Sequence, residues 1–85
     1  MQEALKDAKR RVVGARQVLR AVSAGSLAHA YIARDADPFI TRPVMDACEK
    51  AGVPFTEVDT MTLLGQSAGI DVKASVAGVL KESHT

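Results

Sequence analysis

This sequence of 85 residues has no tryptophan, one tyrosine, two phenylalanines and a single cysteine, Cys48. One cysteine cannot form a disulfide within the chain, and no second thiol or close histidine gives it the spacing of a metal site. No apolar run approaches the roughly 20 residues that cross a bilayer. The first ten residues mix acids and bases without a following apolar segment, unlike a secretory signal. We therefore expect a cytoplasmic protein without a membrane partner.

The sequence also has little that suggests catalysis. It contains no Gly-x-Ser-x-Gly turn and no glycine-rich phosphate loop ending in Lys-Ser or Lys-Thr. His29 opens a predicted strand, and His84 has no chemical partner near it in the sequence. Cys48 lies on the apolar stripe of a predicted helix, which favours a core residue because free cysteine is usually buried. We expect a non-enzymatic protein that needs no cofactor.

Length and composition predict one globular domain spanning residues 1–85. Hydrophobic residues make up 47% of the chain and charged residues 25%, which is typical of globular proteins. A chain of this size hides only about 60 to 65% of its unfolded surface, so a deep enclosed pocket is not expected. The functional site should therefore lie on a face of the molecule.

Charge is divided unevenly along the chain. Residues 1–34 contain seven basic and two acidic side chains, a net charge of +5, whereas residues 35–85 contain four basic and eight acidic ones, a net charge of −4. Such polarity indicates an anionic partner for the basic half or, equally well, a solvated helix surface.

Helical and extended patterns alternate along the sequence. Apolar spacing predicts helices over 3–12, 15–24, 41–51 and 61–68, the last capped by Asp59 or Thr60. Short apolar or β-branched runs predict strands over 29–33, 53–58 and 74–80, with room for one more between the first two helices. The alternation predicts an α/β fold with helices on both sides of a small sheet.

One face of the helix over 15–24 is polar at its beginning. Arg16, Gln17 and Arg20 share a sector opposite the apolar stripe, and Gly14 precedes them without a side chain. Guanidinium groups can bond phosphates or the O6 and N7 atoms of guanine, and an amide can read a base edge. The alternative is an ordinary solvated polar face.

Two further segments leave alternatives open. Asp35 and Asp37 follow a predicted strand, where carboxylates can hold magnesium, although Asp-x-Asp-Pro is also ordinary turn chemistry. Ile70 and Val72 lie in a predicted loop, where they either turn into the core or form an apolar platform for an unstacked base.

Three segments, 12–20, 33–38 and 64–72, together resemble the kink-turn-binding ribosomal-protein family that includes L7Ae and L30e, and its bacterial branch in particular. The resemblance covers nearly the whole chain in the same order. It implies a three-layer α-β-α sandwich with a small mixed four-stranded sheet. It also implies binding to a kink-turn, an RNA helix bent sharply at a bulge that is followed by sheared G·A pairs.

The resemblance also implies a set of RNA-binding residues. The family segment that contacts the guanines corresponds to Gly14, Ala15, Arg16, Gln17 and Arg20. An acidic position next to the RNA-binding helix corresponds to Asp37, and the apolar loop that packs against bulged nucleotides corresponds to Ile70, Asp71 and Val72. Arg16 and Gln17 depart from the family's Asn-Glu pair. Thr62, Leu63 and Gln66 stand where many relatives have lysines, which predicts weaker binding with a shallower salt dependence.

These observations predict a monomeric, non-enzymatic protein that recognises kink-turn RNA and associates with the ribosome. A ribosomal subunit protein that needs neighbouring RNA and protein is the rival within this class. The alternative from another class is a small α/β protein-interaction or ligand-binding domain that uses the turn at Asp35 and Asp37.

Overall fold

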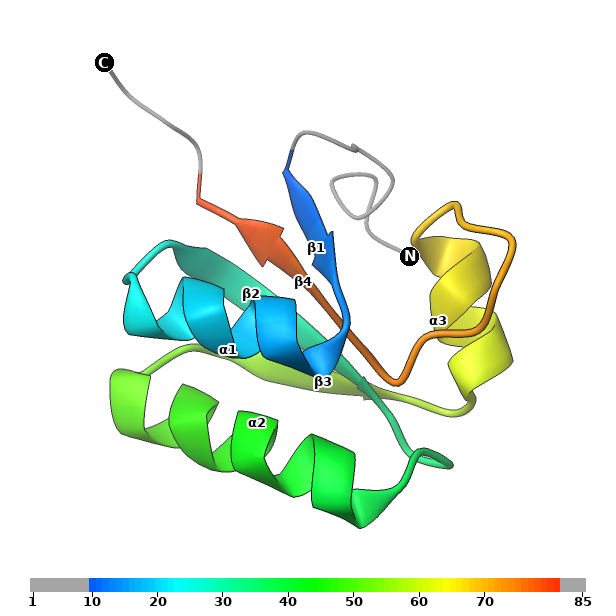
Figure 1. Ribbon diagram of the computed structural model, residues 1–85, viewed down its shortest axis with the longest axis horizontal. Helices are drawn as coiled ribbons and strands as arrows, with labels where there is room; N and C mark the ends of the chain where they lie inside the picture. The colour runs from blue at the N-terminus through cyan, green and yellow to red at the C-terminus, as the bar shows by residue number, and fades with distance from the viewer. Residues whose placement is uncertain (1–9, 82–85) are drawn as a thin grey trace.

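The computed structural model describes residues 10–81, which form four strands and three helices (Figure 1). In chain order the elements are β1 Arg11–Val13, α1 Ala15–Ser23, β2 Leu27–Ala33, α2 Pro38–Ala51, β3 Phe55–Val58, α3 Met61–Ser67 and β4 Val76–Leu80. Helix and strand alternate as the sequence pattern predicts.

The four strands form one mixed sheet in the order β1-β4-β2-β3. Strand β4 is antiparallel to both of its neighbours, β1 and β2, whereas β2 and β3 are parallel. Strands β1, β2 and β3 therefore all run in the same direction. Their carboxyl ends meet at one edge, where β4 begins.

Helices cover both faces of the sheet, which confirms the predicted three-layer α-β-α sandwich. Helices α1 and α2 lie side by side on one face, and α3 lies on the other (Figure 1). Each face has its own core. Under α1 and α2 the core includes Val18, Ile32, Val44 and Val76, and under α3 it consists largely of alanines and valines around Tyr31 and Leu64.

The predicted helix over 3–12 is wrong at its C-terminal end. Arg11 and Val12 belong to strand β1, which pairs Arg11 with Val79 and Val12 with Gly78. Pairing with β4 gives hydrogen-bond partners to the backbone of Val12 and Val13, whose β-branched side chains favour strands. This long-range pairing outweighs the weak helical propensity indicated by the local spacing of apolar residues. The rest of that prediction, residues 3–9, lies outside the described residues, as does His84.

Helix α2 begins three residues before the predicted start at Thr41. Pro38 occupies the first turn, and the Asp37 carboxylate accepts the N–H of Phe39 at 2.9 Å. This cap together with the fixed φ of proline starts the helix early, so that Pro43 lies inside it.

The Thr60 hydroxyl caps α3 by accepting the N–H of Leu63 at 3.0 Å, as one of the two predicted caps.

Burial shifts the pKa values of three titratable groups in the sheet and its core. It lowers the pKa of His29 and raises the pKa of the Tyr31 hydroxyl and of the Cys48 thiol, in each case because the charged form loses solvent.

Cys48 is 0% exposed, which confirms its predicted core position. No helix within residues 10–81 combines the length and apolar character of a membrane span.

Candidate nucleic-acid interface

Backbone hydrogen bonds join three distant segments at the edge where β1, β2 and β3 end. The N–H of Gly14 donates to the carbonyl of Val76 at 2.8 Å, and the N–H of Ala33 donates to that of Ser75 at 2.9 Å. The N–H of Arg34 donates to Val58 at 2.8 Å. The start of α1, the turn between β2 and α2, and the loop before β4 are therefore held beside one another. All the site residues predicted from the sequence lie in these three segments.

The first segment is the sharp entry into α1. Gly14 has a φ of 99°, a conformation that other residues adopt only with strain, and it caps the helix without a side chain. Arg16, Gln17 and Arg20 are exposed, whereas Val18 on the opposite side is 0% exposed. The predicted division between a polar face and an apolar face is confirmed. Three adaptable hydrogen-bonding side chains project from the edge at this point.

The second segment is the turn between β2 and α2, where both aspartates accept backbone hydrogens. Asp37 caps α2, and an Asp35 carboxylate oxygen accepts the N–H of Met61 at 2.8 Å. The carboxylate of Asp35 thus connects this turn to the beginning of α3. Both side chains remain exposed. Among residues 10–81 no group of three or more potential metal ligands comes together.

The third segment is the loop between α3 and β4, in which the two apolar residues have different environments. Ile70 is half-buried and packs against the core under α3. Val72 is 67% exposed, and Asp71 beside it is also exposed. With Thr62 and Gln66 of α3, the loop lines a hollow of about 280 Å³. The two predicted alternatives therefore apply to different residues. Ile70 packs into the core and anchors the loop, whereas Val72 faces solvent, where it could contact a base.

Two residues that sequence reasoning missed hold this loop in place. A Cβ on Gly65 would come within 2.1 Å of the carbonyl oxygen of Val72, so the loop lies directly on α3 only because Gly65 has no side chain. The Arg11 guanidinium donates to the carbonyl of Ala68 at the C-terminal end of α3. A glycine inside a helical pattern was the available signal for the first contact. Nothing local in the sequence indicates the second.

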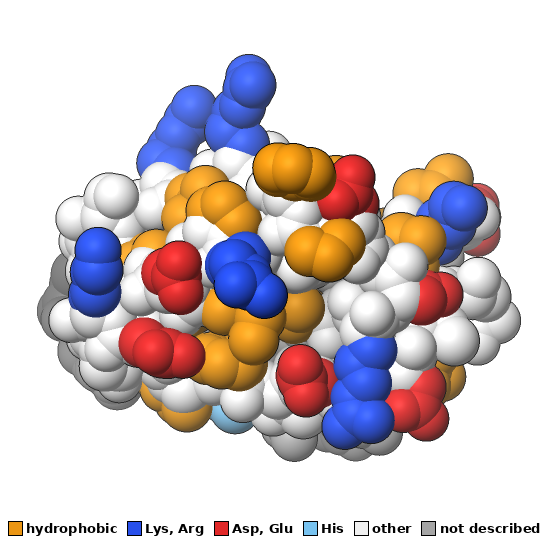
Figure 2. Space-filling model, turned by 90° about the horizontal axis from the view of Figure 1, so that it is seen from below, with side chains coloured by type: hydrophobic (Ala, Val, Ile, Leu, Met, Phe, Trp, Pro, Cys, Tyr) orange, Lys and Arg blue, Asp and Glu red, His pale blue; other side chains and the backbone are white. Residues whose placement is uncertain are grey.

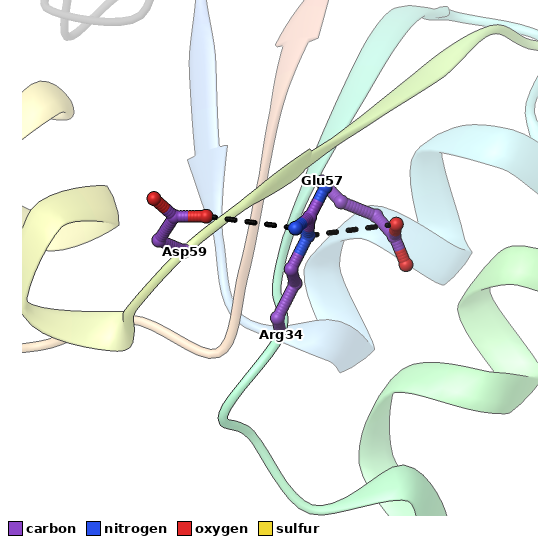
Figure 3. A network of polar contacts seen from close by, with 3 residues as sticks. All are labelled: Arg34, Glu57 and Asp59. Atoms are coloured by element: carbon purple, nitrogen blue, oxygen red, sulfur yellow. Dashed lines mark ion pairs between the residues drawn. The ribbon is translucent and has the colours of Figure 1, made fainter.

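Arg34 is the basic residue at this edge whose charge is offset by neighbours. Its guanidinium lies 3.7 Å from Glu57 and 3.7 Å from Asp59, and all three side chains are substantially exposed (Figure 3). By contrast, the side chains of Arg16 and Arg20 form no ion pair with another residue in the described part of the chain. Among residues 10–81, the positive charge at this edge without an ion pair therefore lies on Arg16 and Arg20 of α1 and on Lys73 of the loop before β4.

Comparison with known proteins identifies relatives over most of the chain. The family described as ribosomal protein L7Ae/L30e/S12e/Gadd45 matches residues 1–85. A protein of Caldanaerobacter subterraneus subsp. tengcongensis, named as an RNA-binding protein, is 44% identical over 68 residues, covering 80% of this chain and 83% of its own. An RNA-binding protein of Geobacillus is 38% identical over 79 residues, covering 93% of this chain and 96% of its own.

A solved structure has the same fold. The 15.5kD RNA-binding protein of Giardia lamblia superposes with a TM-score of 0.86 at 30% sequence identity. The similarity covers 94% of this chain and 70% of the Giardia protein.

Proposed function

Because this chain belongs to the ribosomal protein L7Ae/L30e/S12e/Gadd45 family, we propose that it is a non-enzymatic protein that binds structured RNA containing a kink-turn. The observation that carries the proposal is the meeting of three segments at one edge of the sheet. Gly14 at the start of α1 donates to Val76, and Ala33 before the turn at Asp37 donates to Ser75, so both segments are bonded to the residues that follow the loop over 70–72. The names of the relatives support an RNA partner.

The chemistry of the edge fits a bent RNA helix with bulged nucleotides. Arg16, Gln17 and Arg20 can donate to guanine O6 and N7, and Gln17 can also accept from an amino group. Exposed Val72 offers an apolar surface to a base that has left the helical stack. Gly14, Ala15 and Asp37 give the backbone close access and hold the two helix starts in position. These residues, with Ile70 and Asp71, form the RNA site that we propose.

We further propose that the protein acts as a cytoplasmic monomer, as one domain over residues 1–85, and in association with the ribosome. The small site predicts recognition of one RNA feature rather than wrapping of a long RNA. The competing function, a ligand or partner held by Asp35 and Asp37, is less well supported. Each of these carboxylates already accepts a backbone hydrogen bond that starts a helix.

Gel retardation with a kink-turn duplex tests the proposal. We expect binding that weakens strongly when the sheared G·A pairs are replaced by Watson–Crick pairs, because the groove then no longer presents the same guanine edges. Equal affinity for both duplexes would leave only general attraction to phosphate and would refute kink-turn recognition.

Substitution of Arg20 tests the α1 contacts within the same assay. Arg20→Ala should weaken binding to the kink-turn by roughly 1 to 3 kcal/mol and reduce its preference over plain duplex. Lys50→Ala is the matched control, because it removes one positive charge from the last turn of α2, at the opposite end of that helix from the proposed site. If Lys50→Ala costs as much as Arg20→Ala, base readout by Arg20 is wrong.

A further inference from the structure

The first turn of α2 holds an aromatic ring in solvent. Phe39 is 91% exposed, although phenylalanine is among the residues most often buried. The other aromatic residues, Tyr31 and Phe55, are buried and half-buried. The backbone of Phe39 is held by its hydrogen bond to Asp37, a residue of the proposed RNA site. Phe39 therefore follows Asp37 of the proposed site by two residues in the same helix turn, and its ring belongs to neither core cluster.

A shallow hollow of about 400 Å³ lies beside this ring on the outer face of α2. It is lined by Pro38, Phe39, Arg42, Pro43 and Asp46. Its volume is in the range of small-molecule sites, which span roughly 300 to 1,000 Å³, so one nucleobase can enter. Figure 2, in which α2 faces the viewer, shows hydrophobic side chains of this surface interspersed with basic and acidic ones.

The polar side chains of the hollow provide both a donor and an acceptor. Arg42 and Asp46 are four residues apart on α2 and so lie on the same helix face as Phe39. They form no ion pair with each other or with any other residue among 10–81. The Arg42 guanidinium can donate to O6 or N7 of guanine, and the Asp46 carboxylate can accept from its N1–H and amino group. No other RNA base presents this combination of adjacent acceptors and donors.

We propose that the hollow beside Phe39 takes an unpaired guanine of the bound RNA, stacked on the ring and bonded by Arg42 and Asp46. The inference rests on the proposed function and extends it to a second base contact outside the kink-turn segments. Asp46, the acidic side chain of the lining, offsets the charge of Arg42, so the hollow offers no net positive charge to a phosphate, whereas an uncharged base face does not require one. The occupant is therefore a base, while the RNA backbone follows the basic start of α1.

A kink-turn duplex with a single-stranded extension tests this directly. One guanine is placed at each position of an otherwise all-uridine extension, and binding is compared with that of the all-uridine RNA. We expect one position at which guanine tightens binding by about tenfold, the scale of one stacked base. Phe39→Leu should abolish that gain, because it keeps apolar bulk but removes the flat ring, and Phe39→Trp should retain it. Asp46→Asn should reduce the preference for guanine.

Ile40→Ala is the matched control, since Ile40 is 41% exposed on the same turn but carries no ring. It should leave the gain from guanine unchanged. A wild type that binds the all-uridine kink-turn RNA but gains nothing from guanine at any position would overturn this inference alone. A wild type that binds no kink-turn RNA would overturn the proposed function as well. Loss of a concentration-dependent dimer in Phe39→Leu, without any effect on RNA, would assign the ring to a second copy and also overturn the inference.

Discussion

Arg11, Arg16, Arg20 and Arg34 look alike in the sequence but have different roles in the fold. Arg11 donates to the end of α3, and Arg34 lies between Glu57 and Asp59. Exposed pairs such as those of Arg34 contribute only about 0 to 1 kcal/mol to stability, but they offset charge locally. Among these four arginines, the positive charge available at the edge therefore falls on Arg16 and Arg20, which helical periodicity had already assigned to one exposed face.

The distinction between these arginines could be predicted only in part. The polar face of α1 follows from positions one helical turn apart, which the sequence displays directly. The hydrogen bond of Arg11 joins residues 57 apart, and the bond from Met61 to Asp35 joins residues 26 apart. Such contacts depend on sheet order, which no local pattern encodes.

His29 predicts a pH dependence of stability. Burial lowers its pKa below the ordinary value of 6.5, so the unfolded chain binds the proton more readily than the folded protein. Stability should therefore be full above about pH 6.5 and decrease as the pH falls through the lowered folded pKa. Urea melts from pH 8 to pH 5 measure this effect.

His29→Gln is the control for that series, because glutamine does not titrate and can still bond the Thr56 hydroxyl, which lies 2.8 Å from Nε2 of His29. The free energy of unfolding should decrease less with falling pH in the variant than in the wild type. Identical pH profiles would show that His29 does not contribute to the acid sensitivity.

Helix α3 and the loop that follows it form a unit whose geometry depends on Gly65. Gly65→Ala should destabilise the protein by roughly 1 to 3 kcal/mol, because the new methyl group would overlap the backbone of Val72. This cost exceeds the gain of about 1 kcal/mol that alanine normally brings to a helix. Gln66→Ala, at an exposed neighbouring position, should change stability by no more than about 0.5 kcal/mol. A Gly65→Ala variant as stable as wild type would mean that the loop moves away freely.

The two apolar residues of this loop should respond differently to truncation. Val72→Ala should leave the free energy of unfolding almost unchanged and weaken kink-turn binding by about 1 kcal/mol, because Val72 is exposed in the free protein. Ile70→Ala should cost about 1 to 3 kcal/mol of stability, because Ile70 packs against the core. Neither variant should alter the salt dependence of binding, since no charge is lost. Urea melts and RNA titrations at two salt concentrations measure both effects, and a destabilised Val72→Ala with normal binding would place Val72 in the core instead.

Element types were predicted best where the pattern was long or flanked by strong signals. The helices at α1, α2 and α3 and the strands β2, β3 and β4 all coincide with predicted segments, and their ends shift by a few residues. The prediction of a helix over 3–12 was wrong in its last residues, because strand β1 is only three residues long and leaves little local pattern. Such a short strand is stabilised by its partner, and β4 lies at the other end of the sequence.

At the scale of the whole molecule, the sheet brings together segments that are separate in the sequence. Three parallel strands end at one edge, so the loops that follow β1 and β2 lie next to the loop that precedes β4. The resemblance to a family implied this grouping, whereas composition and periodicity alone did not. Exposed Phe39 at the start of α2 is an additional feature of this edge that the sequence pattern left unassigned.

Mapping of backbone amide shifts by NMR during titration with a kink-turn duplex tests the central claim most directly. We predict that the amides over 14–20, at Asp37 and over 70–72 shift together and saturate at one equivalent of RNA. Amides over 50–53, at the opposite end of α2, should remain in place. Shifts that spread evenly over the surface, or that cluster over 50–53 and spare 14–20, would contradict the assignment of RNA binding to this edge.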